Sequence, residues 1–441
     1  MGECPFDVGR VLSVDQDLVN DPYPVWAELR ASAPVYREPL FGVYVVTKYD
    51  DIVDVARRPN DFSSILAAYG PNSGDRGVVP DTLSEAAVNA GTGDSLPAGY
   101  VEKMLVDYEA DIQDQLQHVD PPLHTHHRRI VSRWFTPEVL AEREPEMRDI
   151  ARSLADQFAD GGEVEILDAF AGPFPATVVA DTIGIPEEHR ALFLDWKEEV
   201  IGNPEAETSR VASERYRKIR ELFREFIGLR REHPENDLIT ALVEAKTAAG
   251  EPLDDVAVLG ILMLFLGGGQ ETTAKAFTTG LRMLAQHPEL QKELTEDPTR
   301  IPAFVEEILR IDPPVRGIFR LARHDTEVGG VLIPEGALLQ IMWASGNRDE
   351  CVFARADEFD PRRTVDGKSL ERPFLTFGHG VHLCPGAPLA RLQLRVGFEE
   401  LLARFSSFHL SERNDYRYFK SQVLRGLAGL WLHLEPRDVA R

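Results

Sequence analysis

Cys384 is the residue of this sequence whose surroundings most directly predict chemistry. It lies in the segment Phe-Gly-His-Gly-Val-His-Leu-Cys-Pro-Gly (377–386), directly before a stretch with helical periodicity. The free N–H groups at the start of a helix stabilise a thiolate, which is the form of cysteine that binds metals. The glycines of the segment also allow backbone amides to approach the sulfur closely. A cysteine on its own is most often a small buried residue, and Cys4 and Cys351 are interpreted in that way.

Glu271 and Thr272 form a second candidate pair. They directly follow Gly267–Gln270 inside a long apolar stretch. A carboxylate beside a hydroxyl can relay protons to a reacting group, although a helical threonine also commonly bonds back to the preceding turn without any catalytic role. Each glycine would destabilise an ordinary helix by about 1 kcal/mol. The sequence therefore predicts a special requirement for small residues in this part of the helix.

Histidine and arginine are concentrated in the segment Asp-Pro-Pro-Leu-His-Thr-His-His-Arg-Arg (120–129). The spacing of the three histidines matches none of the usual zinc motifs, so we do not interpret the segment as a metal site. Cationic donors such as His124 and Arg128 can instead pair with a buried anion.

Glu307 and Arg310 stand three residues apart on one predicted helix face. Such a pair is by default a surface ion pair that contributes a few tenths of a kcal/mol. The pair lies after the long apolar stretch and before Pro313-Pro314. This position can be interpreted only together with the other segments of the chain.

Helices dominate the elements that must position these residues. The hydrophobic periodicity predicts helices from Asp120 onward, among them one long helix over 256–286, and a further helix from Pro388. Short strands are expected at Val35–Tyr36 and Tyr44–Thr47, and a strand-rich part follows Pro314. The stretch 63–119 is rich in Gly, Asp, Ser and Ala, which is typical of either a functional lid or a disordered segment.

Composition limits the class of protein. The chain has 441 residues with a formal net charge of −25, which argues against binding to nucleic acid or to anionic lipid. Three cysteines cannot supply a disulfide framework for this length. The acidic start lacks the apolar region of a signal peptide, and the longest apolar run is too short to span a bilayer. We expect a soluble, cytoplasmic protein without a membrane anchor, and a monomer.

These segments together resemble the cytochrome P-450 family. The segment 377–386 matches every fixed position of that family's cysteine-ligand loop, Phe-Gly-x-Gly-x-His/Arg-x-Cys-x-Gly. Glu307-x-x-Arg310 resembles the family's Glu-x-x-Arg element, and 268–272 resembles its oxygen-activation motif, with Gly268 for Ala and Gln270 for His. The segment 120–128 is similar to the family's Asp-Pro-Pro-Glu-His-Thr helix, with Leu123 for Glu. The resemblance extends in order from about Asp21 to about Leu434.

The resemblance implies a fold and a cofactor. It implies one mainly α domain with a minor β lobe over residues 1–441, shaped as a triangular prism around heme b, in place of the three domains that length alone suggests. Cys384 would be the axial ligand of the heme iron, within a loop that also contains Phe377 and Gly378. Propionate contacts would come from His124, Arg128, Arg320 and His382, and the structural group on the cysteine side would be Glu307, Arg310 and Arg363.

The resemblance also implies a heme-thiolate monooxygenase. Glu271 and Thr272 would supply protons while O2 is reduced with electrons that come from NAD(P)H only indirectly, through a ferredoxin and a ferredoxin reductase. The product would be a hydroxylated or epoxidised hydrophobic small molecule such as a terpenoid, a steroid or an aromatic compound. The expected pocket is formed by the lid 63–119 and by Leu264, Gly268, Val315, Ile318, Phe319, Leu424 and Leu427.

The sequence leaves two alternative functions open and also suggests one docking surface. A peroxide-driven peroxygenase would keep Cys384 but has less need of Glu271 and Thr272, and a heme-binding member without monooxygenase activity would keep the heme alone. A basic patch on the cysteine side could dock an acidic ferredoxin, although the same arginines could simply be solvated. That predicted patch consists of His126, Arg129, Arg133, Arg391 and Arg395.

Overall fold

A computed structural model describes most of the chain. The described residues are 11–12, 15–39, 41–65, 116–201, 208–247, 250–365, 370 and 374–437, and within them the side chains of 195–216 are not described. The predicted lid 63–119 therefore lies almost entirely outside the described residues, apart from its two ends. Cys4 lies outside them as well.

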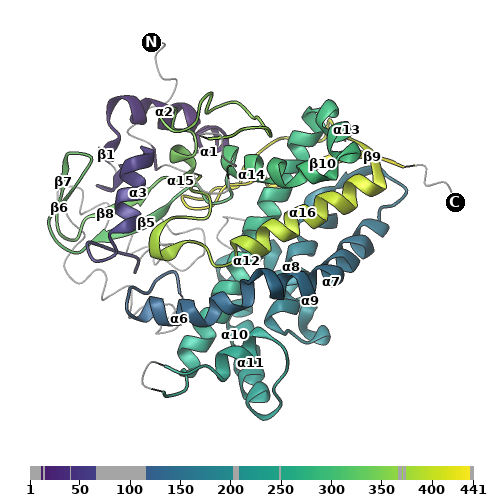
Figure 1. Cartoon of the computed structure of the whole chain (residues 1–441), viewed down its shortest axis with the longest axis horizontal. Coiled ribbons are helices and arrows are strands. Elements are labelled where there is room, and N and C mark those ends of the chain that lie inside the picture. The colour runs from purple at the N-terminus through teal and green to yellow at the C-terminus, as the bar shows by residue number, and fades with distance from the viewer. Residues whose placement is uncertain are drawn as a thin grey trace.

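Helices make up most of the described chain, and the longest of them lie in the centre and on the right of Figure 1. The long helices are α7 (Pro137–Asp156), α9 (Glu187–Ile201), α10 (Thr208–Glu232), α12 (Asp255–Gln286) and α16 (Ala387–Arg404). Shorter helices are α1 (Gln16–Asn20), α2 (Tyr23–Ser32), α3 (Tyr49–Arg57), α6 (Leu123–Ser132), α8 (Pro173–Ile183), α11 (Leu238–Val243), α13 (Pro288–Glu296), α14 (Ile301–Ile311) and α15 (Trp343–Gly346). The expected mainly α architecture is confirmed.

Small sheets form the minor β part. The largest has the order β1-β2-β8-β5-β3, from β1 (Val35–Arg37), β2 (Tyr44–Val46), β8 (Leu338–Ile341), β5 (Ile318–Ala322) and β3 (Phe62–Ser63). A second sheet has the order β4-β10-β9, from β4 (Gly162–Glu165), β10 (Trp431–Pro436) and β9 (Phe405–Leu410), and β6 (Thr326–Val328) pairs with β7 (Val331–Ile333). The first sheet lies on the left of Figure 1, away from the helical bundle. The two strands predicted near the N-terminus, β1 and β2, are present and antiparallel.

Helix α12 runs through the centre of the bundle. Its first turn is capped by Asp254, whose carboxylate accepts a hydrogen bond from the Ala257 N–H at 2.8 Å, which satisfies one of the free amides of a helix start. Most of its residues are buried on all sides, as expected for a helix in the core of a large protein. Within the described ranges, α12 is also the one helix long and apolar enough to cross a membrane, but 61% of its most apolar window is buried inside the protein.

Two reciprocal glycine–phenylalanine contacts hold α12 against α16. A Cβ on Gly397 of α16 would lie 2.5 Å from Phe277 of α12, and a Cβ on Gly280 of α12 would overlap Phe398 of α16. The two rings lie 5.2 Å apart. Each glycine thus accepts the ring of the other helix, so the helices approach closely and interlock. This contact positions the helix that begins after Cys384 relative to the one that carries Glu271.

Asp312, directly after α14, joins both ends of the chain to this core. Its carboxylate is buried and accepts hydrogen bonds from Arg425 Nε at 2.7 Å, Tyr418 OH at 2.7 Å and Tyr23 OH at 2.9 Å. Burial alone would raise the pKa of Asp312, but the cations of Arg425 and Arg282 and the Tyr418 hydroxyl hold that pKa well below its usual range. Asp312 is therefore a carboxylate in the folded protein at neutral pH.

We predict that Asp312→Asn lowers the free energy of unfolding by about 3–5 kcal/mol at pH 7, because it leaves the buried Arg425 cation unpaired. A carboxyl group whose pKa is lowered by folding stabilises the protein above its unfolded pKa of about 3.9 and loses that effect as the pH falls. The difference in melting temperature between the two proteins should therefore shrink below about pH 4. Asp415→Asn, in an exposed pair with Arg417, is the control and should change the melting temperature little. A constant difference from neutral to strongly acidic pH would contradict this role.

Candidate active site

The loop that carries Cys384 is folded back on itself. Gly378 and Gly380 have φ values of 76° and 71°, which glycine adopts without strain. The Cys384 N–H donates to Phe377 O at 2.7 Å, and the Gly378 N–H donates to Leu375 O at 2.8 Å. The chain then enters α16 at Ala387, so Cys384 lies at the start of that helix as predicted.

The surroundings of the Cys384 thiol act on its pKa in opposite directions. Loss of hydration on burial raises this pKa. Hydrogen bonds from the backbone N–H groups of Gly386 and Ala387 lower it, and so do the charges of Arg128 and Arg391. The balance leaves the pKa of the thiol above its ordinary value. A bound metal cation would reverse this balance, because it stabilises a coordinating thiolate directly.

Four cationic or potentially cationic side chains meet beside this loop. The rings of His124 and His382 lie 4.1 Å apart. Arg320 on β5 is 3% exposed, and its guanidinium donates to the carbonyl of Phe319. Arg128, one turn after His124 on α6, reaches the Val381 carbonyl of the cysteine loop at 3.5 Å. We call these four residues, His124, Arg128, Arg320 and His382, the cationic cluster.

The positive charge of the cationic cluster comes from Arg128 and Arg320, because the two histidines are neutral at pH 7. Burial and the charges of neighbouring residues lower the pKa of His382 to about 2 and that of His124 to about 4. Burial also lowers the pKa of Arg320 to about 10, with Asp120 opposing the shift. Both ring nitrogens of His124 are buried and have no hydrogen-bond partner among the described residues. An anion that accepts hydrogen bonds fits this arrangement, and the propionates of a heme next to Cys384 are such groups.

Asp120 and Ser64 support the cationic cluster, and the sequence did not single them out. Asp120 accepts hydrogen bonds from Ser63 Oγ, from the Ser64 N–H at 2.9 Å and from Arg323. The Ser64 hydroxyl lies 2.9 Å from His382 Nε2. These contacts tie β3 to the start of α6. The Asp-Pro-Pro signature contained Asp120, but nothing in the sequence indicated its partners.

Glu271 and Thr272 lie together on α12 and differ in exposure. The Glu271 side chain is buried, whereas Thr272 is half-buried and its hydroxyl donates to Gly268 O at 2.7 Å. The bond to the preceding turn that the sequence left open as an alternative is thus present. It uses only the donor of the hydroxyl, and the oxygen keeps its lone pairs as acceptors.

The glycines of α12 do not interrupt the helix. It is continuous from Asp255 to Gln286. The absence of a side chain leaves room for a neighbouring helix at one glycine and open space at another. A Cβ on Gly269 would lie 2.8 Å from Val179 of α8, whereas one on Gly268 would meet, within the part of the chain that the structure describes, only Leu264 at 3.9 Å.

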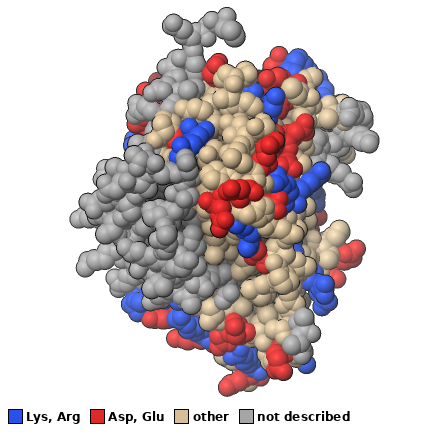
Figure 2. All heavy atoms as spheres, turned by 90° about the vertical axis from the view of Figure 1, so that its left-hand side faces the viewer, with Lys and Arg blue, Asp and Glu red and all other residues tan. Residues whose placement is uncertain are grey.

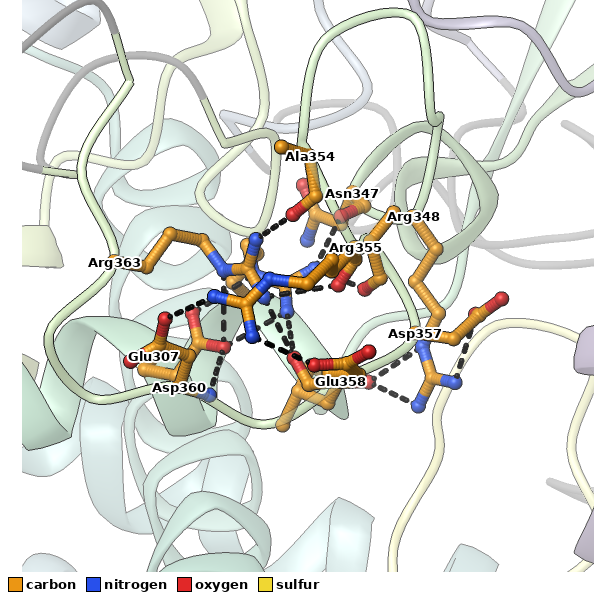
Figure 3. Close-up of polar contacts among 12 residues, drawn as sticks. Glu307, Asn347, Arg348, Ala354, Arg355, Asp357, Glu358, Asp360 and Arg363 are labelled. Atoms are coloured by element: carbon orange, nitrogen blue, oxygen red, sulfur yellow. Dashed lines mark hydrogen bonds and ion pairs between the residues drawn. The ribbon is translucent and has the colours of Figure 1, made fainter.

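Glu307, Arg310 and Arg363 form a buried ionic group. Glu307 accepts two hydrogen bonds from Arg310 at 2.8 Å each. It accepts one more from Arg363 at 3.2 Å, and Figure 3 shows these two side chains next to each other. Arg310 continues to the carbonyl oxygens of Asn347, Ala356 and Glu358. The default expectation of a surface ion pair is therefore wrong, and the three residues meet as the resemblance implied.

A chain of hydrogen bonds leads from this ionic group to the cysteine loop. Asn347, whose carbonyl binds Arg310, donates its side-chain amide to Thr376 Oγ at 2.8 Å and accepts from the Leu375 N–H. Leu375 in turn accepts from Gly378. The ionic group thus holds the backbone from which the turn to Cys384 begins.

Two of the predicted pocket residues are fully buried in the hydrophobic core. Phe319 is fully buried and packs in the cluster with Trp26 and Leu338. Alternate residues of a strand point to opposite faces, so Phe319 points away from the side to which Arg320 points. Leu427 is also buried, in the main core. Leu264, Gly268, Val315, Ile318 and Leu424 remain half-buried or exposed, and Val315 pairs with Leu424 through a β-bridge.

The predicted basic patch is smaller than expected. Arg391 pairs with Glu306 at 2.6 Å, and Arg395 pairs with Glu144 at 2.6 Å and with Glu399. Both arginines are thereby neutralised by carboxylates of α14, α7 and α16. Arg129 and Arg133 are exposed. The sequence could not show this because the carboxylates come from distant segments.

We predict that Glu307→Gln lowers the melting temperature by about 5 °C or more, because two buried guanidinium groups lose their anion. The fraction of protein that binds heme should fall with it, as measured by the ratio of heme absorbance to protein. Glu221→Gln, in an exposed pair with Arg217 on α10, is the matched control. Equal changes in melting temperature and heme content for the two substitutions would show that burial of the Glu307 group does not determine its contribution to stability.

Comparison with known proteins agrees with this geometry. The family model described as cytochrome P450 matches residues 191–426. The chain is similar to linalool 8-monooxygenase of Pseudomonas putida (31% identity, covering 94% of this chain and 96% of the relative) and to erythromycin C-12 hydroxylase of Saccharopolyspora erythraea (36% identity, 70% and 78%). Its fold is similar to that of substrate-free Mycobacterium marinum cytochrome P450 CYP150A6, with a TM-score of 0.82 and 32% identity over 98% of this chain and 100% of that one. The chain therefore belongs to the cytochrome P450 family and is a heme-thiolate monooxygenase.

Proposed function

We propose that this monooxygenase binds heme b through Cys384 and inserts one oxygen atom of O2 into a hydrophobic small molecule. The observation that carries the assignment is the contact of Arg128, a member of the cationic cluster, with the Val381 carbonyl of the Cys384 loop at 3.5 Å. A ligand for iron and donors for two propionates thus occur side by side. His124, Arg128, Arg320 and His382 would hold the propionates. When bound, the heme supplies the redox chemistry that activates dioxygen, and the thiolate promotes cleavage of the O–O bond.

Glu271 and Thr272 supply protons in this proposal. Thr272 Oγ is half-buried and accessible from one side of α12, and Glu271 lies next to it in sequence, with a buried carboxylate. The hydroxyl donates to Gly268 O in the structure, so it must turn its O–H away from that carbonyl to give up a proton. The hydroxyl oxygen can then accept a replacement proton through its lone pairs.

The substrate is proposed to be an apolar molecule such as a terpenoid, a steroid or an aromatic compound. Half-buried apolar side chains of α12, β5 and the C-terminal segment support this class, and they are Leu264, Val315, Ile318 and Leu424. Two relatives are named for their action on linalool and on erythromycin. We propose that the enzyme acts as a single cytoplasmic domain of residues 1–441.

Electrons are proposed to arrive from a separate ferredoxin and ferredoxin reductase. Arg129 and Arg133 are exposed at the end of α6. Exposed apolar side chains lie at the start of this helix and in the cysteine loop, namely Leu123, Val381 and Leu383. Exposed basic and apolar side chains of this kind suit the docking of an acidic redox protein. On the face of the molecule in Figure 2, by contrast, acidic and basic side chains are interspersed.

Turnover with different oxidants separates the proposal from its alternatives. Linalool, testosterone and naphthalene are incubated with NADH, O2 and a surrogate ferredoxin system, and product and NADH are measured. The proposal predicts substrate-dependent NADH oxidation with product. Turnover with hydrogen peroxide alone would favour a peroxygenase, and heme binding without turnover by either route would favour a binding protein.

We predict that Thr272→Ala lowers the product formed per NADH by about tenfold or more and increases hydrogen peroxide release, because protons no longer reach the reacting oxygen in time. Thr273→Ala is the matched control, since Thr273 also bonds back by one turn, to Gly269 O at 3.2 Å, but is buried. Its product yield should stay near that of the unmodified enzyme. Unchanged yield in Thr272→Ala would contradict the proton-supply role.

We predict that Arg129→Glu raises the KM for ferredoxin by about tenfold at low ionic strength, with substrate affinity unchanged. Charge at an interface mainly steers association, and salt screens it. The difference from the unmodified enzyme should therefore diminish at high salt. Arg217→Glu on α10 is the control. A KM that is insensitive to Arg129→Glu would place the docking surface elsewhere.

A further inference from the structure

Lys275 stands one turn after Glu271 on α12 and is as deeply buried as that carboxylate. Lys275 is 3% exposed and Glu271 is 5% exposed. Lys275 Nζ lies 3.8 Å from Glu271 Oε1 and 4.2 Å from the centre of the Phe419 ring. Lysine is rarely buried to this extent unless it is paired, and the ammonium here has both a carboxylate and an aromatic face beside it.

The path of the Lys275 side chain is shaped by the C-terminal segment. A Cβ on Gly426 would overlap Lys275 Cγ and would lie 2.8 Å from its Cδ, so the absence of a side chain at Gly426 leaves room for the lysine stem. The segment 418–427 is held as a hairpin by the Phe419 N–H bond to Gly426 O at 3.1 Å and by the bridge from Tyr418 to Leu427. The arrangement is therefore a built contact between α12 and this hairpin.

The pair is not explained by stability alone. A buried ion pair often contributes no more to stability than apolar side chains of similar volume, because both charges lose their hydration. What such a pair does provide is a fixed charge and a fixed orientation. The carboxylate concerned is the one next to Thr272, where a proton donor needs a defined position.

We infer that Lys275 is a positioning residue, which holds the Glu271 carboxylate in place for proton transfer toward Thr272, with Gly426 and Phe419 holding the lysine. The inference rests on the proposed function of Glu271 and Thr272. Lys275 exchanges no proton with the substrate in this scheme. It acts only through Glu271, so its effect should disappear when Glu271 is replaced by Gln.

The test uses the heme-loaded, full-length enzyme with Lys275→Met, a neutral replacement of similar length. NADH oxidation is measured with saturating ferredoxin and no added substrate, in H2O and in D2O, so that no identified substrate is needed. We expect a rate lower by roughly tenfold and a larger solvent isotope effect, because proton transfer becomes limiting. In the Glu271→Gln background, the same replacement should change neither quantity further.

A second readout does not depend on activity. Lys275→Met should lower the melting temperature by several degrees, about 5 °C, because a buried carboxylate is left unpaired. The double variant Glu271→Gln/Lys275→Met should recover most of this loss. The matched control is Lys292→Met, since Lys292 and Glu296 of α13 have the same spacing and the same 3.8 Å separation but are largely exposed.

The outcomes distinguish this inference from the proposed function. If Lys275→Met leaves the solvent isotope effect unchanged, or changes it equally in the Glu271→Gln background, the inference is overturned. The proton-supply proposal would still stand if Thr272→Ala uncouples the enzyme. If Lys275→Met does not accumulate as folded protein, Gly426→Ala retains both charges and displaces the lysine stem. It should raise the isotope effect in the same direction, and an unchanged value would also overturn the inference.

Discussion

The buried ionic group of Glu307, Arg310 and Arg363 is the constraint on which the active-site side of this protein depends. A guanidinium removed from water must have all its donors satisfied, and Arg310 achieves this by bonding to Glu307 and to three backbone carbonyls of the 347–358 region. The irregular chain before the cysteine loop is thereby held by charge-assisted bonds. Through Asn347 and Leu375, the same constraint reaches the turn that begins the loop of Cys384.

The opposite condition holds a few residues away, at the cationic cluster. There Arg128 and Arg320 are cations, whereas burial and neighbouring positive charges lower the pKa values of His124 and His382 and leave both rings neutral at pH 7. The protein thus pairs its charges where they support the backbone and accumulates unbalanced positive charge where the propionates of its cofactor are proposed to bind. On α12 a third arrangement is found, in which Glu271 and Lys275 balance each other inside the core.

The packing of α12 against α16 connects these charged sites. Phe277 of α12 packs against Gly397 of α16, and Phe398 of α16 packs against Gly280 of α12. The helix with the proposed proton donors therefore lies close to the helix that begins after Cys384. Such an interlocking contact permits little sliding, because protein cores are packed at the density of organic crystals. The packing of the core therefore fixes the distance between the Cys384 thiol and the pair of Glu271 and Thr272.

Local sequence patterns determined much of this enzyme. The spacing of glycines around Cys384, the i, i+3 spacing of Glu307 and Arg310 and the long apolar stretch of α12 are contiguous features, and their chemistry depends mainly on neighbours along the chain. The predicted helix over 256–286 differs by one residue at its start from α12, because the cap at Asp254 sits directly before it.

Only the tertiary structure decided which distant groups face one another. The carboxylates that neutralise Arg391 and Arg395 lie on other helices or one turn away, and the face of β5 on which Phe319 lies is set by the register of the sheet. Gly426 opposite Lys275 is a contact across 151 residues of chain. Electrostatic and packing energies depend on distances in space. For residues far apart in sequence, these distances are set only when the whole chain has folded.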